Sequence, residues 1–310
     1  MESVLRTAEK HNDIAFVTVN YNTRELVREM LDFFRSALLP FSYKLVVVDN
    51  NSTDGSHEFL AAQDDLLYVP AGENLGYGRA INRGIQASDS RYICVLNTDV
   101  VLNEACLTRL WEFMEQTPES GVVSPRIANR DGSTQGFIFH KCRASIILNI
   151  VNKLITSALK RKLAQASAPV RVHGVLGAFF VIRRTAFSGD RLFDEDFFFY
   201  YEDTDLAHRL FDAGIPCYAL PDCSVIHLGG SSTSIEGARM FYKSKRLYLT
   251  KHYGSSFAGT ILSLDRLRLR MKHLKYILLS LVIPSEKIAR KKGYYAAMQQ
   301  SILPGGNAGK

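Results

Sequence analysis

The stretch YICVLNTDVVL, residues 92–102, decides the fold class of this chain. Its first five residues are apolar and predict a buried strand, which ends abruptly at Asn97, Thr98 and Asp99. In open α/β sheets, ligands bind at the carboxyl ends of the strands, so the Asp99 carboxylate is placed to hold a divalent cation and, through it, a phosphate. The alternative is a purely structural turn, since Asn, Thr and Asp all favour turns.

Strand-like and helix-like segments alternate along the first third of the chain. Apolar runs predict buried strands at 14–19, 45–48 and 67–69, and helical spacing of apolar residues predicts helices at 24–37 and 104–116. Thr23 is expected to cap the first helix. This alternation is typical of a parallel sheet whose strands are joined by right-handed helical crossovers.

Polar residues follow three of the predicted strands, at 20–22, 49–52 and 97–99. Because the carboxyl ends of parallel strands meet at one edge of a sheet, we expect these residues to lie close together. A turn at each strand end needs no carboxylate, whereas a site for a nucleotide and a metal needs several. The recurrence therefore favours a binding site at this edge.

The segment GENLGYGRAINRG, residues 72–84, places glycines in a loop that opens a helix. Its spacing matches neither the GxGxxG dinucleotide loop nor the GxxxxGK phosphate loop. Glycines there still permit close approach of the backbone to a ligand, and Arg79 and Arg83 add positive charge. A plain glycine-rich turn into a helix is the alternative.

The composition is that of a globular protein with a basic excess. The chain has 310 residues, 46% of them hydrophobic, and a formal net charge of +7, which suits one large domain with or without an appendage. Its five cysteines lack CxxC spacing, so neither a zinc site nor a disulfide framework is indicated, and a cytoplasmic location is expected. No signal peptide is expected, and the apolar run at 276–283 is too short to span a bilayer.

Several motifs follow an order that resembles a known family. The first half contains VTVNYN, VVVDNNSTDG, ENLGYGRAINRG and LNTDV, and the second half contains GVLGAFFVIRR, FDEDFFFYYEDTDLAHRLFDAG and HLGGSS. Over residues 13–250 the chain resembles the inverting family 2 glycosyltransferases, especially their rhamnosyltransferase-like branch. The resemblance implies an α/β GT-A fold, which is Rossmann-like, with a C-terminal helical appendage. Asn97 and Thr98 depart from many relatives, which have Asp first or Pro between, and this leaves one carboxylate in the triplet.

The resemblance implies a site for a nucleoside diphosphate sugar. Asn20 and Asp49 would bind the base and ribose, and their hydrogen-bonding groups suit the uracil or thymine of UDP or dTDP. The other residues expected to contact the donor are Asn22, Asn51, Asn74, Gly76, Asn82, Asn97 and Thr98. Asp99 would hold Mg²⁺ or Mn²⁺, with His227 as a second ligand. A lone His after a strand is otherwise more often structural.

The segment YYEDTDLAHRL supplies the expected catalytic base. Its three carboxylates stand at the start of a predicted helix, where the helix dipole alone accounts for one of them. The resemblance assigns Asp203 as the base that deprotonates the acceptor hydroxyl, and Glu202 as a neighbour that orients or binds the acceptor. Asp205 and Arg209, four residues apart, are expected to form a structural ion pair.

Small residues in GVLGAFFVIRR form a further candidate element. Gly177 and Ala178 resemble the part of the family pattern that leaves room for a sugar, and the resemblance assigns them to the acceptor site. A buried strand is the alternative for Ala178.

The C-terminal part is strongly basic. Residues 264–292 hold nine Lys and Arg residues against two acidic ones, next to the apolar residues 276–279. This pattern is typical of an interfacial membrane anchor, and the alternative is a helix that packs on the catalytic domain or on a second subunit of a homodimer. No nucleic-acid-binding motif accompanies the charge, so nucleic acid is not expected as a partner. We expect a catalytic domain at 1–245, with a nucleotide-sugar half at 13–103 and an acceptor half at 104–245, and a helical extension at 246–310.

The expected activity is inverting, metal-dependent glycosyl transfer. The resemblance alone suggests dTDP-rhamnose as the donor and a saccharide or lipid-linked saccharide as the acceptor, in bacterial cell-surface polysaccharide synthesis. The same mechanism with a UDP-hexose or UDP-GlcNAc donor is an alternative. A silent sugar-nucleotide binding module is another, and the joint presence of Asp49, Asp99, Asp203 and His227 argues against it.

Overall fold

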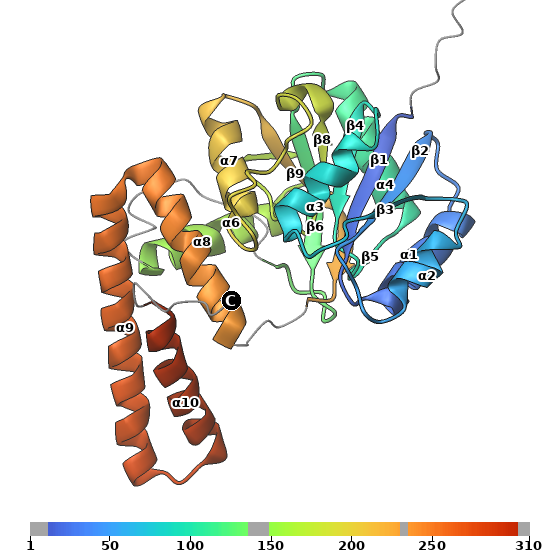
Figure 1. The fold of residues 1–310 in the computed structure, drawn as a ribbon. Coiled ribbons are helices and arrows are strands. Elements are labelled where there is room, and N and C mark those ends of the chain that lie inside the picture. Colours follow the sequence, from blue (N-terminus) through green and yellow to red (C-terminus); the bar gives the residue numbers. More distant parts are fainter. Residues whose placement is uncertain (1–11, 136–148, 230–234, 303–310) are drawn as a thin grey trace, which may run out of the picture.

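The computed structural model describes residues 12–135, 149–229 and 235–302, which form a mixed sheet flanked by helices and followed by a helical extension (Figure 1). Within these residues the strands lie in the order β3-β2-β1-β4-β8-β6-β9-β5, and β7 pairs with β9. The strands are β1 Ile14–Asn20, β2 Tyr43–Asp49, β3 Leu67–Pro70, β4 Tyr92–Leu96, β5 Val100–Val101, β6 Val122–Ala128, β7 Val170–Val172, β8 Phe179–Arg183 and β9 Cys217–His227. The helices are α1 Arg24–Ser36, α2 Ser56–Ala61, α3 Tyr77–Gln86, α4 Glu104–Gln116, α6 Asn149–Gln165, the 3-10 turn η1 Arg184–Ala186, α7 Glu202–Asp212, α8 Ile235–Tyr253, α9 Ser255–Val282 and α10 Glu286–Ser301.

The first four strands pair as the sequence predicts. β1 runs parallel to β2 and β4, and β2 runs parallel to β3. Asn20 lies opposite Asp49 in the register of β1 and β2, so the polar ends of these strands meet at one edge. Beyond β4 the sheet is mixed, because β8 runs antiparallel to both β4 and β6, while β9 runs parallel to β6.

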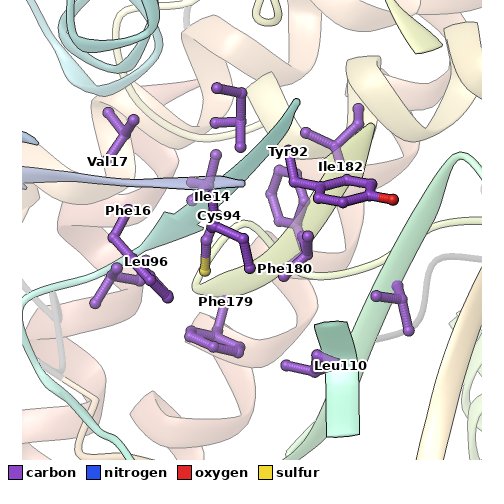
Figure 2. Packing of buried hydrophobic residues seen from close by; sticks show 14 of the residues in the cluster. Ile14, Phe16, Val17, Tyr92, Cys94, Leu96, Leu110, Phe179, Phe180 and Ile182 are labelled. Carbon is purple, nitrogen blue, oxygen red and sulfur yellow. The ribbon is translucent and has the colours of Figure 1, made fainter. Parts of the chain in front are cut away.

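The core lies where β1, β4, β8 and α4 meet. Figure 2 shows their side chains packed together; those labelled are Ile14, Phe16, Val17, Tyr92, Cys94, Leu96, Leu110, Phe179, Phe180 and Ile182. The Phe16 ring also packs on Phe34 of α1, with ring centroids 4.8 Å apart. A strand that is buried on both faces needs apolar side chains at nearly every position. Each such strand therefore appears in the sequence as a continuous apolar run, and its position could be predicted.

The C-terminal helices are attached to the catalytic part. α8 runs without a break through the expected boundary at residue 245. Residues of α8 and α9 form an apolar cluster with Phe197 and Tyr201, which precede α7. α9 and α10 lie side by side and extend away from the sheet (Figure 1). Among the described residues, no helix has the length and apolar content needed to cross a membrane.

Candidate active site

A hydrogen-bonded network joins the carboxyl ends of β1, β2 and β4. The Asn20 amide nitrogen donates to Asp49 Oδ1 over 2.7 Å and to Ser52 Oγ over 2.9 Å. The Thr23 hydroxyl donates to the Asn20 amide oxygen over 2.8 Å, and it lies 3.1 Å from the Thr98 hydroxyl. Thr23 stands at the N-cap position of α1, but its side chain makes no capping hydrogen bond. The expected cap is therefore wrong, because the Thr23 hydroxyl binds Asn20 instead.

Two asparagines turn the chain above this network. Asn22 and Asn51 have φ angles of 55° and 67°, in the left-handed region that Asn tolerates better than most residues. The Asn22 side-chain oxygen accepts a hydrogen bond from the main-chain N–H of Thr53 over 2.7 Å. Both asparagines are exposed, so they form an accessible rim over the buried Asn20 and Asp49 pair.

The glycine loop before α3 is held by a second asparagine pair. Asn74 Oδ1 accepts from the main-chain N–H of Gly76 over 3.0 Å and from the buried Asn50 amide over 2.9 Å. Gly76 has φ of 79°, and a Cβ on it would lie 2.2 Å from the carbonyl oxygen of Phe198. The next main-chain N–H, from Tyr77, donates to that same carbonyl over 2.9 Å. Gly76 thus lets the loop touch the segment that leads to the candidate base.

Asn82 lies beneath this loop. It is 1% exposed. Its side-chain oxygen accepts from the Phe193 N–H over 2.9 Å, and its nitrogen donates to the Phe193 carbonyl over 2.8 Å and to Glu195 Oε1 over 3.2 Å. The Asn82 amide therefore positions the segment 193–195. A cavity of about 460 Å³ borders this segment. Arg79 and Arg209 line it, but none of the residues predicted to bind the donor, the acceptor or the metal does.

Asp99 and His227 lie side by side where β5 pairs with β9. His227 Nε2 is 3.2 Å from Asp99 Oδ1, and His227 Nδ1 is 2.8 Å from Gln135 Oε1. The pairing of β5 with β9 brings them together, since Val100 lies opposite His227. Burial alone would raise the pKa of Asp99, but the hydrogen bond and charge of His227, together with main-chain amides, hold this pKa below its ordinary value.

The Asp99 and His227 pair fits a divalent cation. Two ligands at neighbouring positions of an octahedral ion, each about 2.1 Å from it, lie roughly 3 Å apart, close to the observed separation. Among the described residues there is no group of three or more His, Cys, Asp and Glu side chains able to hold a metal. These two side chains would therefore form only part of the coordination shell of such an ion.

Tyr77 connects the two halves of the site. Its hydroxyl oxygen is 2.8 Å from Asn97 Oδ1 and 3.0 Å from the carbonyl oxygen of Gly177. Burial raises the pKa of Tyr77, and the negative charges of Asp99 and of the two carboxylates that open α7 raise it further. The Tyr77 hydroxyl therefore stays protonated as a fixed hydrogen-bond donor between the candidate metal ligands and the candidate base.

Glu202 and Asp203 open α7 in different surroundings. Asp203 Oδ2 accepts the main-chain N–H of Gly177 over 3.1 Å, and Oδ1 accepts the Thr204 N–H over 2.6 Å. Glu202 is 8% exposed, and its Oε2 has no hydrogen-bond partner within the described residues. Burial and the charge of Asp203 raise the pKa of Glu202 from its ordinary 4.5 to about 8, and burial also raises the pKa of Asp203. Hydrogen bonds from N–H groups favour a carboxylate, so Asp203 keeps the charge and Glu202 keeps the proton near pH 7.

Gly177 and Ala178 link Asp203 of α7 to the segment 97–99. A Cβ on Gly177 would lie 3.1 Å from Asp203 Cβ, so a residue without a side chain permits the amide to approach the carboxylate. The Ala178 carbonyl accepts the Asn97 N–H over 2.9 Å, while its side chain is 3% exposed and belongs to the core. The element thus lies between the segment 97–99 and Asp203.

The segment before α7 has a strained backbone. Tyr200 and Tyr201 have φ angles of 67° and 69°, which are unusual for large side chains. Ser244 of α8 donates a hydrogen bond to the Phe199 carbonyl over 2.7 Å, and the Tyr201 ring lies 5.3 Å from the ring of Tyr248. Packing against α8 therefore maintains the conformation that presents the α7 carboxylates.

The third carboxylate of this motif has a structural role. Asp205 Oδ2 accepts from Arg209 Nε over 2.7 Å, which confirms the predicted ion pair. Asp205 Oδ1 lies 2.7 Å from His252 Nε2 of α8. Asp205 therefore ties α7 to the C-terminal helices.

Comparison with known proteins decides the family. The sequence model of the family described as "Glycosyl transferase family 2" matches residues 15–189, which is more than half of the chain. The chain belongs to this family. One relative is the N-acetylglucosaminyl-diphospho-decaprenol L-rhamnosyltransferase of Mycobacterium tuberculosis (strain ATCC 25618 / H37Rv), 28% identical over 238 residues, which cover 68% of this chain and 76% of the relative. Another is rhamnosyltransferase WbbL of Escherichia coli (strain K12), 21% identical over 223 residues, 69% of this chain and 83% of WbbL. This family 2 chain is thus a glycosyltransferase of the rhamnosyltransferase-like branch.

Solved structures of other proteins, one of them a mannosyltransferase, share its fold. The mannosyltransferase PcManGT from Pyrobaculum calidifontis, in complex with GDP-Man and Mn²⁺, superimposes with a TM-score of 0.56 at 14% identity, over 95% of this chain and 88% of PcManGT. S. aureus TarS 1–349 in complex with UDP gives a TM-score of 0.53 at 15% identity, over 93% of this chain and 80% of that 1–349 chain. The GT-A fold expected from the sequence is therefore confirmed.

Tyr77 of this family 2 site was not predicted from the sequence, whereas Asn50 and Ser52 lie in the polar stretch 49–52 that was predicted at this edge without individual roles. Tyr77, Asn50 and Ser52 all hydrogen-bond to predicted site residues. Tyr77 had a local signal, because it directly follows Gly76 at the first position of α3. Asn50 and Ser52 belong to a polar loop whose members look alike until the fold selects the inward-facing ones.

Proposed function

We propose that this family 2 glycosyltransferase transfers a sugar from a nucleoside diphosphate donor to an acceptor hydroxyl with inversion at the anomeric carbon, in a metal-dependent reaction. The observation that carries the proposal is that the Tyr77 hydroxyl lies 2.8 Å from Asn97 Oδ1, two residues before Asp99, and 3.0 Å from the carbonyl oxygen of Gly177, whose N–H donates to Asp203. A candidate base and a candidate cation site are thus parts of one connected site. This arrangement argues against a silent sugar-nucleotide binding module, which would need no base.

Asp203 is the proposed base. It accepts N–H hydrogen bonds from Gly177 and Thr204, so it is the carboxylate of the pair that carries the charge. In the reaction its oxygen takes the proton of the acceptor hydroxyl as that hydroxyl oxygen bonds to the anomeric carbon. The bond from the anomeric carbon to the diphosphate breaks at the opposite face, so the configuration inverts.

Glu202 is the proposed acceptor ligand. Its Oε2 is buried without a partner in the described part of the chain, and the carboxyl is protonated near pH 7. A protonated carboxyl can donate a hydrogen bond to a sugar hydroxyl, which a carboxylate cannot. Gly177 and Ala178 belong to the same proposed acceptor wall.

Asp99 and His227 are the proposed ligands of Mg²⁺ or Mn²⁺. A cation there would stabilise the negative charge that develops on the departing diphosphate. The low pKa of Asp99 keeps its carboxylate ionised and able to coordinate at neutral pH.

The proposed donor site is the network at the ends of β1, β2 and β4. Asn20 and Asp49 lie at its base, and Asn22 and Asn51 form its exposed rim, with Asn74, Gly76, Asn97 and Thr98 along the wall. We propose dTDP-rhamnose as the donor, because the two relatives described above are named rhamnosyltransferases. A UDP sugar is the second candidate, because TarS was solved with UDP.

The proposed acceptor is a saccharide, free or lipid-linked, in bacterial cell-surface polysaccharide synthesis, because the mycobacterial relative is named for a decaprenol-linked saccharide. The proposed location is cytoplasmic, with peripheral contact to the inner face of the membrane through the basic C-terminal helices. The proposed domains remain a catalytic part at 1–245 and an extension at 246–310, with α8 as the shared helix. Both a membrane and a second copy of the chain are candidate partners of that extension.

The test combines ligand binding with turnover. A nucleotide sugar that binds the folded state should raise the melting temperature, and dTDP-rhamnose with Mn²⁺ should do so more than UDP-glucose or UDP-GlcNAc. Asp203→Asn should keep this shift and lose about 10²–10⁴-fold in turnover, whereas the exposed control Asp64→Asn should keep both. Asp99→Ala should make the shift insensitive to Mn²⁺. Near-normal turnover of Asp203→Asn would refute the base assignment, and the absence of a shift with every donor would refute the transferase proposal.

A further inference from the structure

Helix α9 carries two apolar stripes, and only one of them is covered. The inner stripe includes Leu262 and Leu269, which are buried with Ile302 in an apolar cluster, and Tyr276, whose ring stacks on Tyr295 of α10. The outer stripe consists of large apolar side chains that are 53% to 77% exposed, namely Leu267, Met271, Leu274, Leu278 and Leu281. Soluble proteins rarely expose an aligned apolar row of this kind.

The spacing of the outer stripe defines a single face. Its members recur every three or four residues, which places them on one side of a helix. At 100° per residue, their mean direction points roughly 160° away from Leu269, which faces α10. The row is about 21 Å long at 1.5 Å per residue. It continues at the end of the helix into Val282 and Ile283, which are 79% and 48% exposed.

Basic residues border this outer stripe. Arg270 and Lys275 are exposed on either side of it, and Lys287 and Arg290 follow at the start of α10. Other Lys and Arg residues of α9 and α10 add further positive charge. The acidic residues within 264–292 are Asp265 and Glu286. Asp265 is buried and bonded to Lys245 and Arg268, so it offsets the charge of those two residues and not that of the exposed Arg270 and Lys275.

We infer that the outer stripe of α9 rests on an anionic lipid surface, with the helix parallel to the bilayer. The stripe supplies apolar side chains that can enter the headgroup region, and the bordering cations match the negative charge of the lipids. A second copy of this chain would instead bring two basic helices together, and like charges oppose that contact. The inference deepens the proposed function by naming the face that makes the membrane contact, and it rests on that proposal only for the biological role of the contact.

Vesicle flotation tests the inference without measuring catalysis. The full chain should float with vesicles of phosphatidylcholine and phosphatidylglycerol, and weakly or not at all with phosphatidylcholine alone. The double variant Leu274→Glu/Leu278→Glu should lose at least about tenfold of the binding, because two charges enter the apolar stripe. Leu38→Glu is the matched control, since Leu38 is 87% exposed after α1, and it should float like the wild type. Arg270→Gln/Lys275→Gln should weaken binding to the anionic vesicles and leave the weak binding to phosphatidylcholine vesicles unchanged.

Tryptophan fluorescence tests the same lipid contact in a variant without added charges, in case Leu274→Glu/Leu278→Glu misfolds. Trp111 is the sole tryptophan, so Trp111→Phe/Leu278→Trp places the fluorophore on the stripe. Its emission should shift to shorter wavelength when anionic vesicles are added. Unchanged emission, or flotation of Leu274→Glu/Leu278→Glu at the wild-type level, would overturn the inference. So would a wild-type dimer without vesicles that the same double variant converts to a monomer. Turnover with a soluble acceptor should be equal in these variants, so failure of the lipid contact stays distinct from failure of the proposed activity.

Discussion

Replacing Glu202 with Gln should remove the pH dependence of stability that this buried acid imposes. The side chain is 8% exposed, and its Oε2 has no partner within the described residues. Its pKa is raised from the ordinary 4.5 to about 8 by burial and by the charge of Asp203. Between these two values the folded state holds a proton that the unfolded state releases. The folded protein therefore binds more protons, and its stability falls as the pH rises from 4.5 to 8.

The magnitude follows from this window. Each unit of pKa difference corresponds to about 1.4 kcal/mol, so the full loss is roughly 3–5 kcal/mol. Gln has the same shape and cannot ionise. Near pH 5, Glu202 is protonated, and Glu202→Gln should match the wild type within about 1 kcal/mol. At pH 8.5 the variant should be more stable by roughly 2–4 kcal/mol, after allowing for a buried amide without partners.

Melting temperatures of both proteins across pH 5–8.5 test this prediction. At about 2 °C per kcal/mol for a chain of this size, Glu202→Gln should melt roughly 4–8 °C higher at pH 8.5 and nearly level with the wild type at pH 5. Glu119→Gln is the control, because Glu119 is exposed, and its melting curve should follow the wild type at every pH. Parallel curves for wild type and Glu202→Gln would refute the reasoning, since the side chain would then ionise normally.

Three further substitutions probe the contacts around the site. Tyr77→Phe removes the hydroxyl that joins its two walls, and we expect stability to fall by about 1–2 kcal/mol and turnover to fall about tenfold; unchanged turnover would show that the hydroxyl does not position the walls. Gly76→Ala should cost about 2 kcal/mol or more, because its φ of 79° and the nearby Phe198 carbonyl leave no room for Cβ, and a denaturant midpoint like that of the wild type would contradict this. Ser244→Ala removes the hydrogen bond to the Phe199 carbonyl and should lower kcat while leaving the KM for the donor unchanged, with Ser244→Thr restoring part of the rate; an equal loss in both constants would point to a general structural role.

The sequence alone determined the layout of the nucleotide-binding half. Apolar runs of four to six residues are typical of strands that are buried on both faces, and β1, β2 and β4 lie where those runs predicted them. The boundaries of α4 also match the prediction. The polar ends of these strands could be placed together in advance, because the carboxyl ends of parallel strands meet at one edge, and the structure puts Asn20 opposite Asp49. The ordered motifs gave the family, which the comparisons confirm.

The tertiary structure decided which polar residues act together. Asp99 meets His227 because β9 returns to pair with β5, and no local pattern encodes a contact between residues so far apart in sequence. Glu202 and Asp203 are neighbours with similar chemistry, and only the amides of Gly177 and Thr204 give Asp203 the charge. The two stripes of α9 look alike in sequence as well. Only the positions of α8, α10 and Ile302 bury one and leave the other exposed, because burial depends on what the rest of the chain brings against a surface.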